Sequence, residues 1–434
     1  MRIIYRATLA GAMLMGAAST PARPAASGLN TAIDEALPVA RDAYVFLHTN
    51  PELGKKEVKA HAYLTEKLKA FGYTEFVTSP SLPTAVIAVL DTGRPGATIA
   101  LRAEMDARPL PDGADEPADH SPRSQVPGVM HNCGHDAHAA ILLGVAAMLK
   151  KHVGQLSGKI VFLFQPAEEV AGGADDVVRD GTLAKLGVTR IYAEHSAPGM
   201  PVGTVGVAPG DTLAGSNYFK LVLTGRSSHA AAPADGDDVA LGAMKVAEEM
   251  SDLPARRLDI SSRPAVVSIT NFTTNSGATN VLPGSAEIDG TIRAYEDPTV
   301  APAGGRSLKD IVTARVAAVA SAYGLTPAWK EFRVAAPPTR NDPALFAATA
   351  PVLASAFPGR VDTTTYRSMY SEDFAYYTAK TPALYFSLGI AKDGLGGAGV
   401  HTAGFTIHPD ALRSGMNLMA LLAEIGTSGK AGWR

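Results

Sequence analysis

The chain has 434 residues, of which 46% are hydrophobic and 19% charged, with a formal net charge of −3. This is the composition of an ordinary soluble globular protein. A near-neutral charge without long runs of one sign argues against nucleic-acid binding, which needs a basic stripe. Because single cores tend to split above ~250–300 residues, two domains are expected.

The N-terminus predicts a secretory signal peptide. Arg2 and Arg6 precede an uncharged apolar run over residues 7–18, and small residues close that run. A membrane anchor is the alternative, but the run is too short to span the ~30 Å hydrocarbon core of a bilayer. We therefore expect residues 1–27 to be removed and the mature protein to be exported, to the periplasm or outside the cell, without further membrane contact.

The region before residue 213 alternates between helical and strand-like patterns. A helical pattern over 34–71 is broken at Asn50-Pro51, and a further helix is expected over 137–151. Such alternation predicts an α/β sheet that is covered on both faces. The strand-like runs are 85–90, 98–103, 159–164 and 190–193.

The pattern changes over residues 213–335, where the order is strand, helix, strand, strand, helix, strand. This βαββαβ order is ferredoxin-like. Its strands are expected at 217–224, 265–272, 287–295 and 328–334, and its helices at 237–250 and 307–322. The first pattern then resumes with a helix at 343–356, a strand at 383–388 and a helix from about Pro409. We predict a catalytic domain of residues 28–212 and 336–434, with residues 213–335 inserted into it.

The only cysteine lies in a stretch that also holds three histidines and an aspartate, between His131 and His138. A glycine separates Cys133 from His135, so both side chains can turn onto one ion. A thiolate and an imidazole favour zinc or a similar metal. A buried cysteine beside helix-capping polar residues is the alternative, but the density of histidines outweighs it.

Further candidates stand at the ends of the expected strands, where α/β sheets bind ligands. Glu168 and Glu169 follow the apolar run 160–164, so one can bind a metal while the other faces the substrate. A solvated acidic pair is the alternative. His195 and His401 follow two other expected strands. A lone histidine is more often structural than a metal ligand. These two gain weight because the other candidate ligands need further residues to complete a metal site.

Two more carboxylates, Glu104 and Asp106, follow the expected strand 98–103. They could orient a metal-binding histidine through a hydrogen bond. The alternative is an ion pair with Arg102 or Arg108.

Taken in order, these stretches resemble the M20 metallopeptidase family, and within it the amidohydrolases that include hippurate hydrolases and auxin-conjugate (IAA-amino acid) hydrolases. The resemblance covers about residues 35–425 and is most specific in HNCGHD and QPAEE. The other matching stretches are LHTNPELGKKE, LRAEMDARPL, GRSSHAAAP, TNVLPGSAEIDGTIR, YSEDF and the loop around His401.

The resemblance implies a zinc-peptidase-like catalytic domain that holds two divalent metals per subunit, Zn or Mn, with Co or Ni as alternatives. The implied ligands are Cys133, His135, Glu169, His195 and His401. Asp106 is implied as a further catalytic residue, and Glu104 stands where the family usually has Asp, so we expect slightly altered geometry there.

The resemblance also implies a homodimer formed through the inserted domain. His229 would then reach the active site of the partner subunit, and Asn280 and Arg293 would bind the carboxylate of the substrate.

The implied reaction is hydrolysis of the amide bond of an N-acyl amino acid or a related small conjugate. Metal-activated water would lose its proton to Glu168, the general base, and the metals and His229 would stabilise the oxyanion. A dipeptidase of the same family is the nearest alternative. A nucleophilic Cys133 paired with a histidine would need no metal. A non-catalytic periplasmic binding protein is a third interpretation, disfavoured by the retention of Glu168.

Overall fold

The computed structural model describes residues 25–111, 113–170, 172–364 and 367–429. The predicted signal peptide therefore lies outside the described residues, apart from its last three positions. Among the described residues, no helix is both long and apolar enough to cross a membrane.

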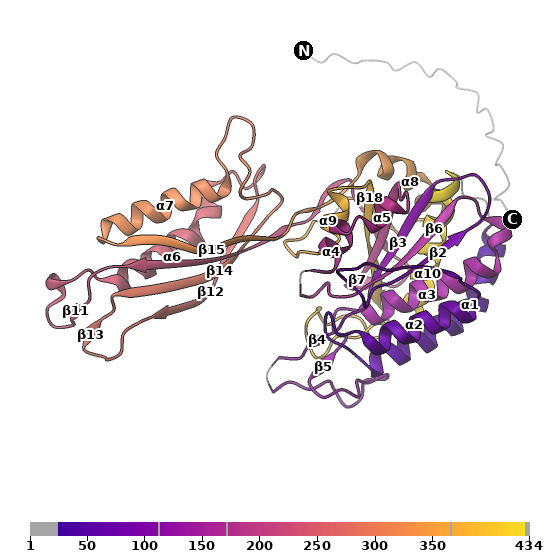
Figure 1. Ribbon diagram of the computed structural model, residues 1–434, viewed down its shortest axis with the longest axis horizontal. Coiled ribbons are helices and arrows are strands. Elements are labelled where there is room, and N and C mark those ends of the chain that lie inside the picture. The colour runs from indigo at the N-terminus through magenta and orange to yellow at the C-terminus, as the bar shows by residue number, and fades with distance from the viewer. Residues whose placement is uncertain (1–24, 112, 171, 365–366, 430–434) are drawn as a thin grey trace, which may run out of the picture.

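The described chain forms a large and a small lobe (Figure 1). In its described part, the large lobe has a mixed sheet of eight strands in the order β1-β2-β6-β3-β7-β18-β8-β17. The strands β6, β3, β7 and β18 run parallel to one another, so their carboxyl ends meet at one edge. The strands are β1 (Glu75–Val77), β2 (Val86–Asp91), β3 (Thr98–Glu104), β6 (Lys159–Gln165), β7 (Arg190–Pro201), β8 (Val205–Gly206), β17 (Val361–Asp362) and β18 (Ala383–Ala391).

Helices cover both faces of this sheet, which confirms the predicted α/β fold. One face packs against α1 (Ala25–Thr49), α2 (Val58–Ala70), α3 (His135–Lys151) and α10 (Asp410–Ser428). The other packs against α4 (Gly173–Arg179), α5 (Thr182–Lys185) and α9 (Ala375–Thr378). Central strands are accordingly apolar along their length, as in β6, where every residue after Lys159 is buried. α8 (Pro343–Ala356) precedes β17.

The small lobe is an antiparallel sheet whose described strands follow the order β12-β14-β10-β15. Together with α6 and α7, which bury their apolar sides against one face, it has the ferredoxin-like arrangement expected from the sequence. The elements in chain order are β10 (Gly215–Thr224), α6 (Val239–Arg257), β12 (Ala265–Thr274), β14 (Ser285–Ala294), α7 (Leu308–Ala322) and β15 (Thr326–Ala336). A short pair, β11 (Ser228–His229) and β13 (Val281–Leu282), lies at the outer end (Figure 1).

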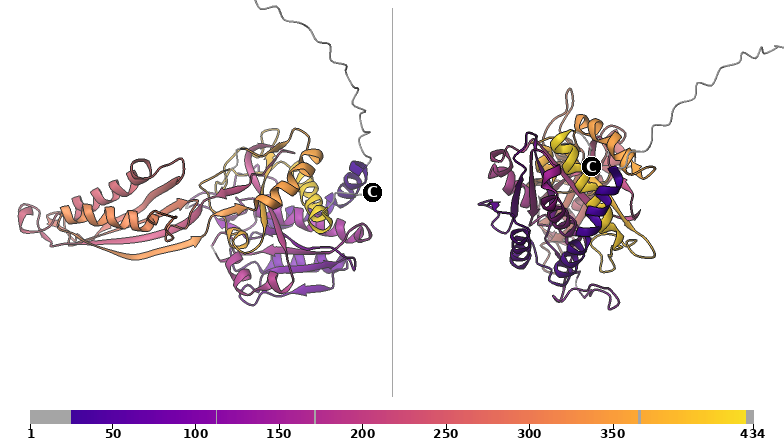
Figure 2. Two further views of the ribbon diagram at one scale, coloured as in Figure 1. Left: turned by 90° about the horizontal axis from the view of Figure 1, so that it is seen from above. Right: turned by 90° about the vertical axis from the view of Figure 1, so that its right-hand side faces the viewer.

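The small lobe stands apart from the large one and is joined to it by two passes of the chain (Figure 2). The outgoing pass contains β9 (Gly210–Leu213) and the returning pass contains β16 (Thr339–Asn341). These two strands pair antiparallel, so the ends of the insertion lie side by side.

Several expected boundaries were wrong, among them the end of β7 and the start of α1. β7 continues to Pro201, because its pairing with β18 goes on through Ser387 and His195 although the apolar run stops at Ala193. His195 is therefore within a strand rather than after it. α1 begins at Ala25, nine residues before the helical pattern that starts at Asp34.

Candidate metal centre

The structure brings the five predicted metal ligands together at the carboxyl edge of the central strands. Cys133 lies just before α3, and His135 opens that helix. Glu169 comes after β6, His195 lies in β7, and His401 is in the loop that follows β18.

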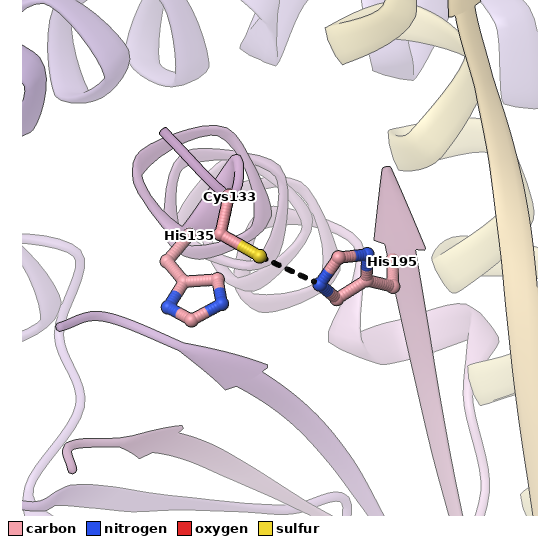
Figure 3. A group of neighbouring side chains, drawn as sticks. All are labelled: Cys133, His135 and His195. Atoms are coloured by element: carbon pink, nitrogen blue, oxygen red, sulfur yellow. Dashed lines mark hydrogen bonds between the residues drawn. The ribbon is translucent and has the colours of Figure 1, made fainter. Parts of the chain in front are cut away.

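The atoms of the five predicted ligands form two overlapping groups, in each of which all atoms lie within 4.8 Å of one another; a further group of this kind joins Glu168 to His135 and Glu169. One group contains Cys133, His135 and His195 (Figure 3). The other contains Cys133, Glu169 and His401. Because the thiol belongs to both groups, the arrangement fits two adjacent cations better than one.

The two histidines of the first group are oriented as metal ligands. The Nδ1–H of His135 donates to the carbonyl oxygen of Asp106 at 2.9 Å, and that of His195 donates to the carbonyl oxygen of Ser196 at 3.0 Å. A carbonyl can only accept, so each Nε2 carries a free lone pair. The Nε2 of His195 lies 3.4 Å from the Sγ of Cys133, and the buried Nε2 of His135 has no hydrogen-bond partner among the described residues.

Negative charge accumulates in this buried centre. Burial and the charges of Glu169 and Glu168 raise the pKa of the Cys133 thiol well above its usual range. Burial and the charge of Glu372 do the same to the pKa of the Glu168 carboxyl. Divalent cations reverse such shifts, because they stabilise the ionised thiolate and carboxylate. The donor set therefore fits two divalent metals.

The members of the acidic pair have different surroundings. Glu169 accepts a hydrogen bond from Nη1 of Arg108 at 2.6 Å and lies 3.3 Å from Nε2 of His401. Although burial opposes it, these contacts and the charge of His135 hold the pKa of Glu169 well below its usual range. Oε2 of Glu168 lies 4.0 Å from Nε2 of His135. Glu169 is thus tethered by an arginine, whereas Glu168 lies beside it among His135 and Glu372.

A cavity of 130 Å³ opens beside these groups. Ligand pockets typically measure ~300–1,000 Å³, so this space holds only the reacting part of a substrate. Four of the five predicted metal ligands and Glu168 line it together with an apolar wall: Cys133, Glu168, Glu169, His195, Ser196, Pro198, Leu213, Tyr370, Ser371, Glu372, Tyr385, Val400 and His401.

Glu104 and Asp106 play different parts. Glu104 forms an ion pair with Arg102, which is the alternative considered from the sequence. Its Oε2 lies 2.9 Å from Nδ1 of His138. Asp106 has Oδ1 3.4 Å from Nδ1 of His135, and its Oδ2 accepts the main-chain N–H of Glu169 at 2.9 Å. Only Asp106 therefore orients a predicted ligand.

Glu372 is not among the site residues predicted from the sequence, yet it lines the cavity beside Glu168. Its carboxylate accepts hydrogen bonds from Arg102 at 2.9 Å and from the hydroxyl of Tyr385 at 3.1 Å. The one sequence feature that could have indicated a role for Glu372 is its position in YSEDF, a stretch that carries the family resemblance. Arg102 lies 270 positions away along the chain, so local pattern could not join them.

Three predicted site residues lie in the small lobe, away from the metal centre of their own chain. His229 in β11 is exposed, and Asn280, just before β13, is exposed beside it. Arg293 is half-buried near the opposite end of β14, facing Ser216 of β10. At ~3.4 Å per residue, the part of β14 from Ser285 to Arg293 alone spans about 27 Å, so one chain cannot direct both Asn280 and Arg293 to one carboxylate.

Comparison with known proteins identifies the family of this chain. A model of the family described as Peptidase family M20/M25/M40 matches residues 100–425. Thermostable carboxypeptidase 2 of Saccharolobus solfataricus is 34% identical over 87% of this chain and 92% of its own. N-acetylcysteine deacetylase of Bacillus subtilis is 32% identical over 87% and 94%, and IAA-amino acid hydrolase ILR1-like 2 of Arabidopsis thaliana is 32% identical over 87% and 82%.

Among solved structures, a Bacillus subtilis protein described as a dinuclear metal binding peptidase from the M20 family superposes with a TM-score of 0.75 and 29% identity. The match covers 90% of this chain and 98% of that one. The resemblance expected from the sequence is thereby confirmed. The chain belongs to peptidase family M20 and is a hydrolase that uses divalent metal.

Proposed function

We propose that this hydrolase cuts the amide bond of N-acyl amino acids or related amino-acid conjugates, with Glu168 as the general base. The observation that carries the proposal is the unequal acidic pair, in which Glu169 is tethered by Arg108 and Glu168 faces the cavity. The names of two relatives, a deacetylase of N-acetylcysteine and a hydrolase of IAA-amino acids, point to the same substrate class.

The metal ligands we propose are Cys133, His135, Glu169, His195 and His401. When bound, the metals supply Lewis-acid polarisation of the carbonyl and a lowered pKa for the attacking water. Glu168 then accepts a proton from that water and delivers it to the leaving amine nitrogen. The main-chain carbonyl of Asp106 accepts the Nδ1–H of His135, and its carboxylate accepts the main-chain N–H of Glu169, so that both ligands keep their places.

Zinc or manganese is our proposed native metal. The thiolate and three imidazoles favour zinc, whereas the carboxylate also suits manganese. Dialysis against a chelator should abolish activity, and reconstitution with each metal in turn, with Co and Ni as alternatives, should identify the ion that restores it. Activity that survives chelation would instead support a nucleophilic Cys133.

We further propose that the active enzyme is a homodimer. His229 and Asn280 lie at the outer end of the small lobe, and Arg293 lies near its junction with the large lobe. This separation supports donation of His229 and Asn280 by the partner subunit, with Arg293 supplied from the chain that holds the metals. A charge-assisted grip by Arg293 on the substrate's carboxylate would then be completed across the interface.

We also propose that the protein is exported, on the basis of the charged and apolar pattern of its first residues. N-terminal sequencing of the protein recovered from the periplasm or medium tests this, and an uncleaved cytoplasmic product contradicts it.

A substrate screen tests the catalytic proposal. Metal-loaded enzyme should hydrolyse N-acetyl and N-benzoyl amino acids, while Glu168→Gln should bind metal without turnover. Peptide controls with a free amino terminus separate the alternatives, because preferential cleavage of dipeptides would favour the dipeptidase.

A further inference from the structure

The turn that presents Glu168 has an unusual backbone. Ala167 has φ +64°, in the left-handed region, although it carries a side chain and is fully buried. Non-glycine residues adopt this conformation only when their surroundings hold them in it. Since Glu168 directly follows Ala167 in the chain, any relaxation of Ala167 would redirect the Glu168 carboxylate.

Glu57, at the start of α2, holds this turn through hydrogen bonds. Its Oε1 accepts the main-chain N–H of Ala167 at 2.9 Å and that of Lys55 at 2.9 Å. Its Oε2 accepts the hydroxyl of Thr84 at 3.1 Å. The carboxyl group is fully buried, so these are its stabilising contacts in place of water.

The position of Glu57 in its own helix supports a role outside that helix. It is the N-cap of α2, yet in the part of the chain that the structure describes its side chain makes no capping hydrogen bond. Glu52 performs that task instead, with Oε2 accepting from the main-chain N–H groups of Lys59 at 2.8 Å and Ala60 at 3.0 Å. A helix that is already capped by Glu52 does not need a buried carboxylate at residue 57.

We propose that Glu57 is a positioning residue, which fixes the left-handed turn at Ala167 and so aims Glu168 at the substrate. The inference rests on the proposed role of Glu168 as the base. Glu169 has an independent anchor, because its main-chain N–H donates to Asp106. Loss of Glu57 should therefore disturb the base more than the metal ligand.

Leucine and glutamine variants separate positioning from plain stability. Glu57→Leu fills the same space without an acceptor, and we expect kcat to fall about 10- to 100-fold, the scale of a misplacement near 1 Å. KM and metal content should change little. Glu57→Gln keeps an acceptor for Ala167 and should recover most of kcat. Glu52→Gln, which weakens the cap of α2, is the matched control and should lower thermal stability while kcat is kept.

A second substitution keeps the test decisive if Glu57→Leu folds poorly. Ala167→Gly makes the left-handed turn accessible without help. The double variant Glu57→Leu/Ala167→Gly should therefore have a higher kcat than Glu57→Leu alone. Thr84→Val removes one partner of Glu57 and should give a smaller loss of kcat in a folded enzyme.

The outcomes distinguish this inference from the function on which it rests. If Glu168→Gln is inactive while Glu57→Leu is folded and turns over normally, the positioning role is wrong and the base assignment stands. If Glu168→Gln itself retains full activity, the base assignment fails first. A loss in Glu57→Leu that Glu57→Gln does not recover would also overturn the proposal.

Discussion

The carboxylate of Asp106 accepts the main-chain N–H of Glu169 at 2.9 Å, while its other oxygen lies 3.4 Å from Nδ1 of His135. The main-chain carbonyl of Asp106 accepts the Nδ1–H of His135, so this residue contacts two predicted metal ligands that come from different segments of the chain. Such supporting contacts commonly contribute as much to a metal site as the choice of a ligand.

Replacement of Asp106 by alanine should therefore weaken metal binding. We expect a loss of ~10–100-fold in metal affinity or activity, because the main chain of Glu169 loses its acceptor and His135 loses the carboxylate charge beside its Nδ1. Competition against a chromophoric chelator measures the affinity, and Asp106→Asn, which retains an acceptor for the N–H of Glu169, should be less severe. An alanine variant with unchanged affinity and kcat would exclude this linking role.

Substitution of Glu168 and substitution of Glu169 should have different effects, one on turnover and the other on metal binding. Glu168→Gln should retain its metals and lose ~10²–10⁴-fold in kcat, the usual contribution of a general base. Glu169→Gln should instead lose metal, because it removes one charge from the ligand group that contains Cys133 and His401. Elemental analysis and kcat on the same samples separate the two effects, and the reverse pattern would exchange the two roles.

Donation across a dimer interface predicts complementation between inactive variants. His229→Ala and Glu168→Gln should each be inactive as homodimers. After subunit exchange, a mixed dimer contains one site with both residues intact, so up to half of its sites should work. Differently tagged subunits allow the mixed dimer to be purified; if that species is inactive, His229 does not serve the partner's site.

Folding stability should depend on pH through His48. Burial lowers the pKa of this imidazole, but its contacts with Asp136 at 2.6 Å and Glu116 at 2.9 Å outweigh burial and raise the pKa from 6.5 to about 9. Because the folded-state pKa is the higher one, the stabilisation is complete below pH ~6.5 and is lost as the pH rises through about 9. A shift of this size corresponds to about 3 kcal/mol.

The matched variant for this prediction is His48→Gln, which cannot titrate. The difference in free energy of unfolding between the two proteins should be largest near pH 6 and should shrink by pH 10. Denaturant titrations at several pH values measure it. A difference that is constant or grows with pH would show that the histidine is not held in its charged form.

The sequence predicted the parts of this site that lie close together in the chain. Cys133 and His135 were recognised as a pair because one glycine separates them, and Glu168 and Glu169 because they follow a buried strand. The partnership of Arg102 with Glu372 could not be found this way, since only the folded chain brings the segment before α9 next to β3, 270 positions away. The role of Glu57 could not be predicted for another reason. An acidic residue at the start of a helix is typical of an exposed cap, and only the structure shows that its carboxylate points inward, to the main chain of Ala167.

The placement of the small lobe within the chain has a consequence for how the enzyme matures. β18 lies between β7 and β8 in the central sheet, yet it follows the whole inserted lobe in the chain. His401 comes later still. A growing chain therefore cannot complete its sheet, or gather its full set of ligands, until nearly all of it has been synthesised. If the protein crosses a membrane unfolded, its metals have to be acquired on the far side, from whatever ions that compartment supplies.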